Sequence, residues 1–122
     1  HSHHAPKSEG ELQDMGAMWA RAGCLVLVPD LLGHGERRQH PFAADKDFPQ
    51  PFRRSRQDYW FRHNAAVHLQ VAGESLVGCM ARDVFSCVDA LLAQPGIDAD
   101  RIAVLGAVAG GGDPAALAAA LD

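Results

Sequence analysis

Hydrophobic side chains recur at helical spacing in two stretches of the chain. In residues 8–22 one helical face carries apolar or small side chains, namely Leu12, Met15, Gly16, Trp19 and Ala22. Residues 75–93 have a longer apolar face, made of Leu76, Met80, Val84, Cys87, Val88, Leu91 and Leu92. The sequence therefore predicts two amphipathic helices. Ser8 with Glu11 matches a capping box at the start of the first, and Gly23 is suited to end it with a positive φ.

Two other stretches, 24–28 (CLVLV) and 101–105 (RIAVL), are apolar without alternation. Runs of this kind are typical of parallel strands that are covered on both faces. The order helix, strand, helix, strand, helix predicts an α/β fold, with a doubly wound parallel sheet in three αβα layers. The last helix is expected to have Asp113 as its N-cap and Pro114 as its first residue. Because two strands leave open edges, further strands from the same or another chain are expected to complete the sheet.

Residues 39–64 lack such periodicity. Three prolines interrupt them, and the run FRRSRQDYWFRHN mixes arginines with aromatic side chains. We interpret this stretch as an excursion or lid within a single domain that covers residues 1–122. Its arginines and aromatic rings could stack on single-stranded nucleic acid, but a solvated or lid-forming loop is the preferred interpretation. Residues 67–72 fit a strand or a helix equally well.

The overall charge and the cysteines exclude several classes of function. With 122 residues and a net charge of −4, the chain has no general attraction to nucleic acid or membranes, so neither is expected as a partner. No apolar run approaches the ~20 residues that span a bilayer, and no signal peptide is visible, which predicts a cytoplasmic protein. Three cysteines without a CxxC pair favour small buried side chains over a disulfide framework. The histidines lack the spacing of a metal site, so neither a metal nor a cofactor is expected.

The stretch VLGAVAGGGD, residues 104–113, is the strongest candidate for chemistry. Its Gly106 and Gly110 provide the frame of a nucleophile elbow, G-x-S-x-G, but Val108 stands where the serine belongs. A phosphate loop is a second interpretation, although no Walker lysine follows and Asp113 would repel an anion. A purely structural turn is the third. Ser75, in GESLVG, resembles an elbow only superficially, and a role as an N-cap is preferred over a nucleophilic one.

Three motifs occur in the order found in α/β-hydrolases. HSHHAPKSEGE, PDLLGHGERR and DADRIAVLGAVAGGG together resemble the branch of this superfamily that contains acetyl xylan esterases and dienelactone hydrolases. The resemblance implies a partial α/β-hydrolase fold. It also implies oxyanion-hole backbone groups at His3 and Ala109, and a pocket lined by five residues: His1, Asp30, His34, Gly106 and Gly110. Ser2 departs from the family's H-G motif, and Val108 replaces the nucleophile.

The resemblance implies a function in ester chemistry. The expected activity is that of a carboxylic ester hydrolase acting on acetyl esters, with a small-molecule ester or a carbohydrate ester as partner. Because the position of the nucleophile holds Val108, no complete triad is expected in this chain. The alternative is a catalytically inactive relative whose pocket binds a ligand or a partner. A weaker hypothesis is an anion-binding module that uses the glycine loop.

Overall fold

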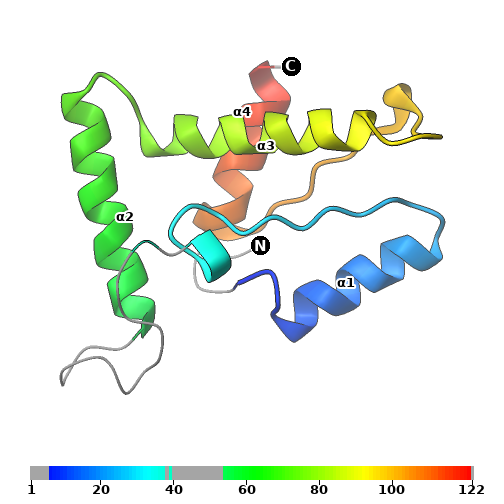
Figure 1. Cartoon of the computed structure of the whole chain (residues 1–122), viewed down its shortest axis with the longest axis horizontal. Coiled ribbons are helices and arrows are strands. Elements are labelled where there is room, and N and C mark those ends of the chain that lie inside the picture. Colours follow the sequence, from blue (N-terminus) through cyan, green and yellow to red (C-terminus); the bar gives the residue numbers. More distant parts are fainter. Residues whose placement is uncertain (1–5, 38, 40–53, 122) are drawn as a thin grey trace.

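The computed structural model describes residues 6–37, 39 and 54–121, and four α-helices account for most of them (Figure 1). They are α1 (Gly10–Arg21), α2 (Arg54–Val71), α3 (Leu76–Leu92) and α4 (Asp113–Leu121). Two 3-10 turns, η1 (Gly35–Arg37) and η3 (Ala99–Arg101), and a π-helical turn, η4 (Val108–Gly112), lie between them.

The predicted parallel sheet is wrong, because no strand forms in the described part of the chain. The structure is that of a small helical domain, so neither the doubly wound α/β class nor a partial α/β-hydrolase fold is supported. The strands predicted at 24–28 and 101–105 do not form: Arg101 belongs to η3, and residues 24–28 and 102–105 run as extended chain (Figure 1) with no backbone hydrogen bond between them. An apolar, β-branched run favours an extended backbone, whereas a strand also requires a paired neighbour.

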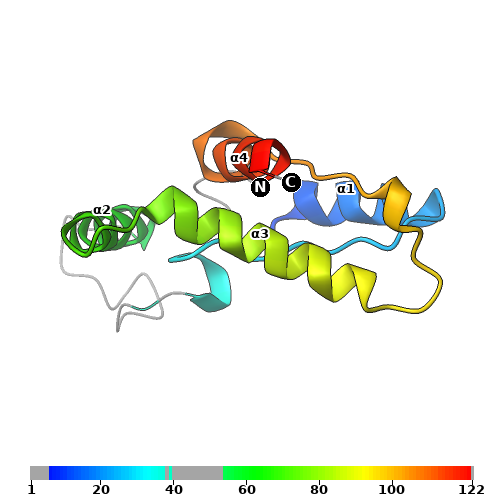
Figure 2. The ribbon, with the colours of Figure 1, turned by 90° about the horizontal axis from the view of Figure 1, so that it is seen from above.

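The helices surround these two extended segments. In Figure 1, α3 lies above and α1 below the segments, while α2 stands across the end of α3. Figure 2 shows α1 between the two segments when the molecule is seen from above. In both views the segments run in the same direction, from the right-hand end of the molecule toward the left. The arrangement therefore has helices on both sides of a layer that contains two unpaired extended segments.

The predicted boundaries of the first helix are partly confirmed. Its end is as expected, because Gly23 has a φ of +90° and the N–H of Cys24 donates to the carbonyl of Trp19 at 3.1 Å. Its start is not, because the helix begins at Gly10 and the N-cap is Glu9, whose side chain makes no capping hydrogen bond. The N–H of Glu9 donates to the carbonyl of Pro6 instead, so a turn precedes the helix and the predicted capping box is absent.

The helix predicted over residues 75–93 is confirmed as α3. The Ser75 hydroxyl accepts a hydrogen bond from the N–H of Gly78 at 3.0 Å, so this serine is the N-cap that the sequence predicts. By contrast, Asp113 is not an N-cap. It has helical angles (φ −62°, ψ −49°) and continues the π-helical turn η4 directly into α4.

The stretch predicted as a lid contains regular structure. Residues 54–64 are the first part of α2, and the ambiguous residues 67–71 complete it. Residues 38 and 40–53 of this region lie outside the described residues, as does the N-terminal segment 1–5. The cysteines are free, as predicted, but they are not buried: Cys24 is exposed, and Cys79 and Cys87 are half-buried. Burial, followed by the nearby charge of Asp83, raises the pKa of the Cys87 thiol.

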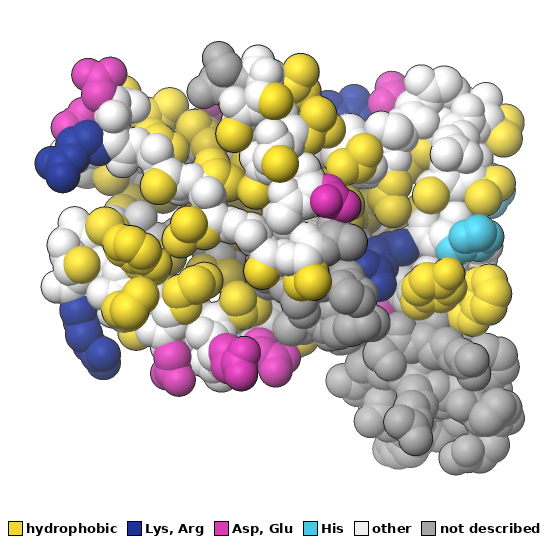
Figure 3. Space-filling view, turned by 180° about the vertical axis from the view of Figure 1, so that it is seen from behind, with side chains coloured by type: hydrophobic (Ala, Val, Ile, Leu, Met, Phe, Trp, Pro, Cys, Tyr) yellow, Lys and Arg dark blue, Asp and Glu magenta, His cyan; other side chains and the backbone are white. Residues whose placement is uncertain are grey.

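The apolar core is small for a chain of this size. Among the described residues, the buried hydrophobic side chains are Leu31, Met80, Ala81 and Ala118. The accessible surface of the chain is 8192 Å², whereas a compact protein of 13.0 kDa exposes roughly 6,300 Å². Hydrophobic side chains are spread over the face shown in Figure 3. Much of the apolar surface that the sequence supplies therefore remains outside the core.

Candidate functional site

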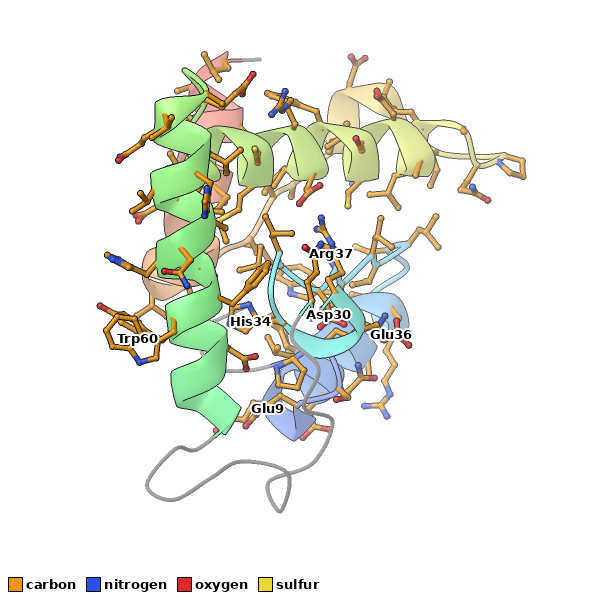
Figure 4. The ribbon with its side chains drawn as sticks, turned by 60° about the vertical axis from the view of Figure 1, so that its left-hand side comes forward. Glu9, Asp30, His34, Glu36, Arg37 and Trp60 are labelled. Carbon is orange, nitrogen blue, oxygen red and sulfur yellow. The ribbon has the colours of Figure 1, made fainter. Side chains whose placement is uncertain are left out.

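The loop that follows the first extended segment is organised by a buried carboxylate. Asp30 is 4% exposed, and it accepts hydrogen bonds from the backbone N–H groups of Lys7 (2.7 Å) and Glu36 (3.2 Å). The ammonium group of Lys7 lies 3.6 Å from the same carboxylate. Figure 4 shows Asp30 beside Glu36 and Arg37 on this loop. The carboxylate thus joins the segment before α1 to the loop of residues 30–37.

The backbone of this loop closes tightly around Asp30. Gly35 has a φ of +50°, and a Cβ atom there would lie 2.5 Å from Oδ1 of Asp30. The His34 side chain is completely buried, on the side of the loop that faces α2 (Figure 4). Asp30 and His34, which the resemblance places in a pocket lining, are therefore both enclosed within the loop and its neighbours.

Two ion pairs extend the network from the loop. Arg37 binds the carboxylate of Asp83 on α3 through both terminal nitrogens, at 2.5 and 3.3 Å, and donates to the backbone carbonyl of Asp30 at 3.3 Å. Lys7 pairs with the exposed carboxylate of Glu36, and this hydrogen bond raises the pKa of Lys7. The network ties the loop to α3 and to the start of the chain, which indicates a structural role.

The second candidate feature is the turn between the second extended segment and α4. Ala107 is extended, and Val108 follows with a φ of +51°, a left-handed conformation that is unusual for a β-branched residue. Its side chain is 59% exposed. The turn thus presents residue 108 to solvent, as the sequence predicts for an elbow, but the side chain presented is a hydrocarbon. Valine has neither a nucleophilic atom nor a titratable proton, so this position cannot supply a nucleophile.

Small residues allow the turn to fold back on itself. A Cβ atom at Gly106 would collide with the carbonyl group of Gly111 and lie 2.9 Å from Cβ of Ala115. Gly110, which the sequence assigns to the same frame, is buried. Ala109 belongs to η4, and the structure describes its backbone but not the surroundings of its side chain. His1 and His3, the other predicted site residues, lie outside the described residues.

We expect Val108→Gly to stabilise the protein by about 0.5–1 kcal/mol, because glycine adopts a positive φ without a steric cost. Thermal unfolding followed by circular dichroism measures the effect. The matched control is Val104→Gly in the extended segment, where the same substitution only adds freedom to the unfolded chain and lowers stability. A lower melting temperature for Val108→Gly would mean that the left-handed conformation at residue 108 carries no strain.

The predicted site residues do not form one constellation. Asp30 and His34 belong to one loop, Gly106, Val108 and Gly110 to another turn, and Ser75 caps α3. In the part of the chain that the structure describes, the side chains of Asp30 and Arg37 bind Lys7, Glu36 and Asp83, and not the turn of residues 106–112. Within the same residues, no group of three His, Cys, Asp or Glu side chains could hold a metal ion.

A third feature was not identified as a site by sequence reasoning. Residues 24–28 and α1 line an open groove of about 480 Å³. Apart from Gln13, the residues that line it have apolar or small side chains, and the lining consists of Leu12, Gln13, Gly16, Ala17, Ala20, Cys24, Leu25, Val26 and Val28. Val26 and Val28 lie close to Gly16. A Cβ atom added at Gly16 would be 3.8 Å from a methyl carbon of each valine. The continuous apolar run at 24–28 was the signal for this surface, because both of its faces need to be covered.

Several large apolar side chains of the two extended segments are exposed to solvent. Leu25 is 54% exposed and Leu105 is 58% exposed, and Leu27 and Val104 are also exposed. Apart from the N–H of Cys24, which belongs to the end of α1, no backbone hydrogen bond is made by residues 24–28 within the described chain. The same holds for residues 102–105. These segments combine unpaired backbone groups with exposed apolar side chains.

The helix α2 also exposes aromatic side chains. Trp60 makes edge-to-face contacts with Tyr59 and His63, with ring centroids 5.6 and 5.8 Å apart. Figure 4 shows Trp60 on the side of α2 that faces away from the loop of residues 30–37. None of the described helices is long and apolar enough to cross a membrane. Tyr59 and Trp60 are both exposed, so the aromatic cluster is a surface feature of α2.

Comparison of this chain with protein families, with curated proteins and with solved structures finds no match. The resemblance to α/β-hydrolases therefore receives no support from a family match, and the helical structure contradicts the fold that it implies.

Proposed function

We propose that this chain is a polypeptide-binding module that takes up an extended segment of a partner by strand addition. The observation that carries this proposal is the unpaired backbone of residues 24–28, which is extended and flanked by exposed apolar side chains. A row of alternating donors and acceptors is best satisfied by another extended backbone, because only a second strand repeats at the same spacing.

Water can satisfy these backbone groups in the free protein, but it cannot cover the apolar side chains beside them. Leu25 lines the groove along α1, and Leu27 is exposed two residues further along the same segment. Burial of apolar area is worth about 25 cal/mol per Å², so a strand that pairs with the backbone and covers these side chains gains from both interactions. Surfaces of this kind mark sites of association.

A fluorescein-labelled peptide with the sequence KKVIVLVKK tests the proposal. Its apolar centre supplies the strand, and its terminal lysines keep it soluble. We expect saturable binding to the folded chain, measured by fluorescence anisotropy. The control is the same peptide with every central amide N-methylated, which keeps the side chains but removes the backbone donors. Equal binding of both peptides would show that apolar contact alone is recognised. Absence of binding by the unmodified peptide would overturn the proposal.

A further inference from the structure

We infer that the partner segment is a single strand, apolar on both faces, that lies between residues 24–28 and 102–105 and runs parallel to both. This inference rests on the proposed function and specifies the occupant of the site. The strand is supplied by polypeptide outside these 122 residues.

The direction of the two segments supports a parallel arrangement. Both run the same way through the molecule (Figures 1 and 2), yet no backbone hydrogen bond joins them. Segments that run in the same direction can belong to one parallel sheet, and a strand placed between them can pair with the facing edge of each. An added strand on the outer edge of one segment would leave the other segment unpaired.

The position of α1 supports a place between the segments. In Figure 2 this helix lies between residues 24–28 and 102–105, and in Figure 1 it lies below them. The groove of about 480 Å³ is formed where α1 meets residues 24–28. A strand set between the segments would rest its side chains on this groove. The α1 residues Leu12, Gly16 and Ala20 line this groove and would contact the strand.

The chemistry of the partner follows from the layers around it. With α1 on one side and α3 on the other, both faces of the added strand would be covered by helices. A parallel strand in this environment is a continuous apolar run rather than an alternating one. Residues 24–28 and 102–105 of this chain already have that composition. An amphipathic strand would place polar side chains against one of the helices and is therefore disfavoured.

A second copy of this chain is a less suitable occupant. Most dimers have twofold symmetry, and twofold pairing of residues 24–28 with the same segment of another copy, across an axis perpendicular to the strands, is antiparallel. Such pairing would also leave residues 102–105 uncovered.

Selective N-methylation of the peptide tests whether one strand pairs with both segments. In a strand, successive N–H groups point to opposite edges, so methylating one alternate set of amides blocks one edge and methylating the other set blocks the other edge. We expect each set alone to weaken binding of KKVIVLVKK at least tenfold, with one peptide bound per chain. If only one set matters, the strand pairs with a single segment and the inference is overturned, although strand addition itself would stand.

Cys24 provides a test of direction, because it is exposed and begins its segment. Neighbouring strands are close enough for a disulfide. A peptide with an activated cysteine at its N-terminal end should cross-link to Cys24 in the double variant Cys79→Ser, Cys87→Ser, and a peptide with the cysteine at its C-terminal end should not. The opposite preference would overturn the parallel arrangement. Light scattering that shows a stable dimer without peptide would favour the second copy as occupant.

Variants of the chain test the contribution of each of the two segments independently. Leu25→Lys and Leu105→Lys each place a charge beside one segment, and we expect either to weaken binding of the unmodified peptide at least tenfold. The matched control is Val71→Lys, which replaces a side chain that is 87% exposed at the end of α2. Circular dichroism confirms that each variant is folded. Unchanged affinity for Leu105→Lys would show that residues 102–105 do not contact the peptide.

Discussion

Gly106→Val is expected to destabilise the protein by about 3 kcal/mol, among the largest effects of any single substitution in this chain. A side chain at residue 106 would collide with the carbonyl group of Gly111, with Cβ 2.5 Å from its carbon, and would press on Ala115 of α4. Backbone on one side and a helix on the other leave no flexible side chain that could move away. The turn would have to open, and α4 would lose its position against α3.

Urea unfolding measures the effect. With a slope of about 1.5–2 kcal/mol per molar urea, a loss of 3 kcal/mol lowers the midpoint by roughly 1.5–2 M. The matched control is Gly10→Val in the first turn of α1, where an added Cβ atom has no neighbour within 4 Å. The control should shift the midpoint only slightly, because a side chain there meets open space. Equal shifts for the two variants would mean that the close approach at Gly106 is unimportant.

The sequence predicted the helices best where periodicity and capping residues agreed. In α3 an apolar face, Ser75 at the N-cap and Pro95-Gly96 beyond the end all pointed to the same boundaries. In α1 the glycine end was correct, but the serine start was not. The reason is local: a turn between Pro6 and Glu9 takes up the residues that a capping box would need. Capping patterns therefore located the helix without fixing its first residue.

The helix α2 was missed because its signal is weak. Its polar, aromatic and apolar side chains are distributed around the helix, so no apolar face stands out in the sequence. The prolines at 41, 49 and 51 drew attention to irregular structure, although none lies within Arg54–Val71. The useful signal was the absence of proline and glycine over the 21 residues between Pro51 and Gly73, which include the whole of α2. A helix without breakers can form even where periodicity does not reveal it.

The sheet could not be derived from the two apolar runs. Such runs predicted buried parallel strands at 24–28 and 101–105, but neither forms a strand in the described part of the chain, and Arg101 belongs to η3. What such a run does not specify is the identity of the neighbouring strand, because pairing depends on segments distant in sequence or in another chain. The frame of the turn was a better guide, since Gly106 and the left-handed residue 108 lie where the glycine pattern places them. That pattern predicts the shape of the turn without predicting its chemistry.

Asp30→Ala is expected to destabilise the protein by about 3 kcal/mol, because the carboxylate holds two backbone N–H groups in a buried position. Without it, the amides of Lys7 and Glu36 lose their acceptor, and the loop of residues 30–37 loses its link to the start of α1. The substitution also removes a partner of the Lys7 ammonium group. Asp30→Asn is expected to recover only part of the loss, because both carboxylate oxygens accept a hydrogen bond and one of them becomes an amide NH2 group that faces an N–H donor.

Two controls separate this role from general effects of charge. Asp89→Ala removes an exposed carboxylate from α3, and it should change stability by less than about 0.5 kcal/mol. Glu36→Gln removes the negative charge that pairs with Lys7. Because the side chain of Glu36 is 80% exposed, this variant should leave the urea midpoint unchanged. Hydrogen exchange provides a second measurement, because the amides of Lys7 and Glu36 should lose protection in Asp30→Ala before the helices do. If Asp30→Ala unfolds at the same urea concentration as Asp89→Ala, the buried carboxylate does not hold the loop, and the loop of residues 30–37 must be fixed instead by the pairing of Arg37 with Asp83.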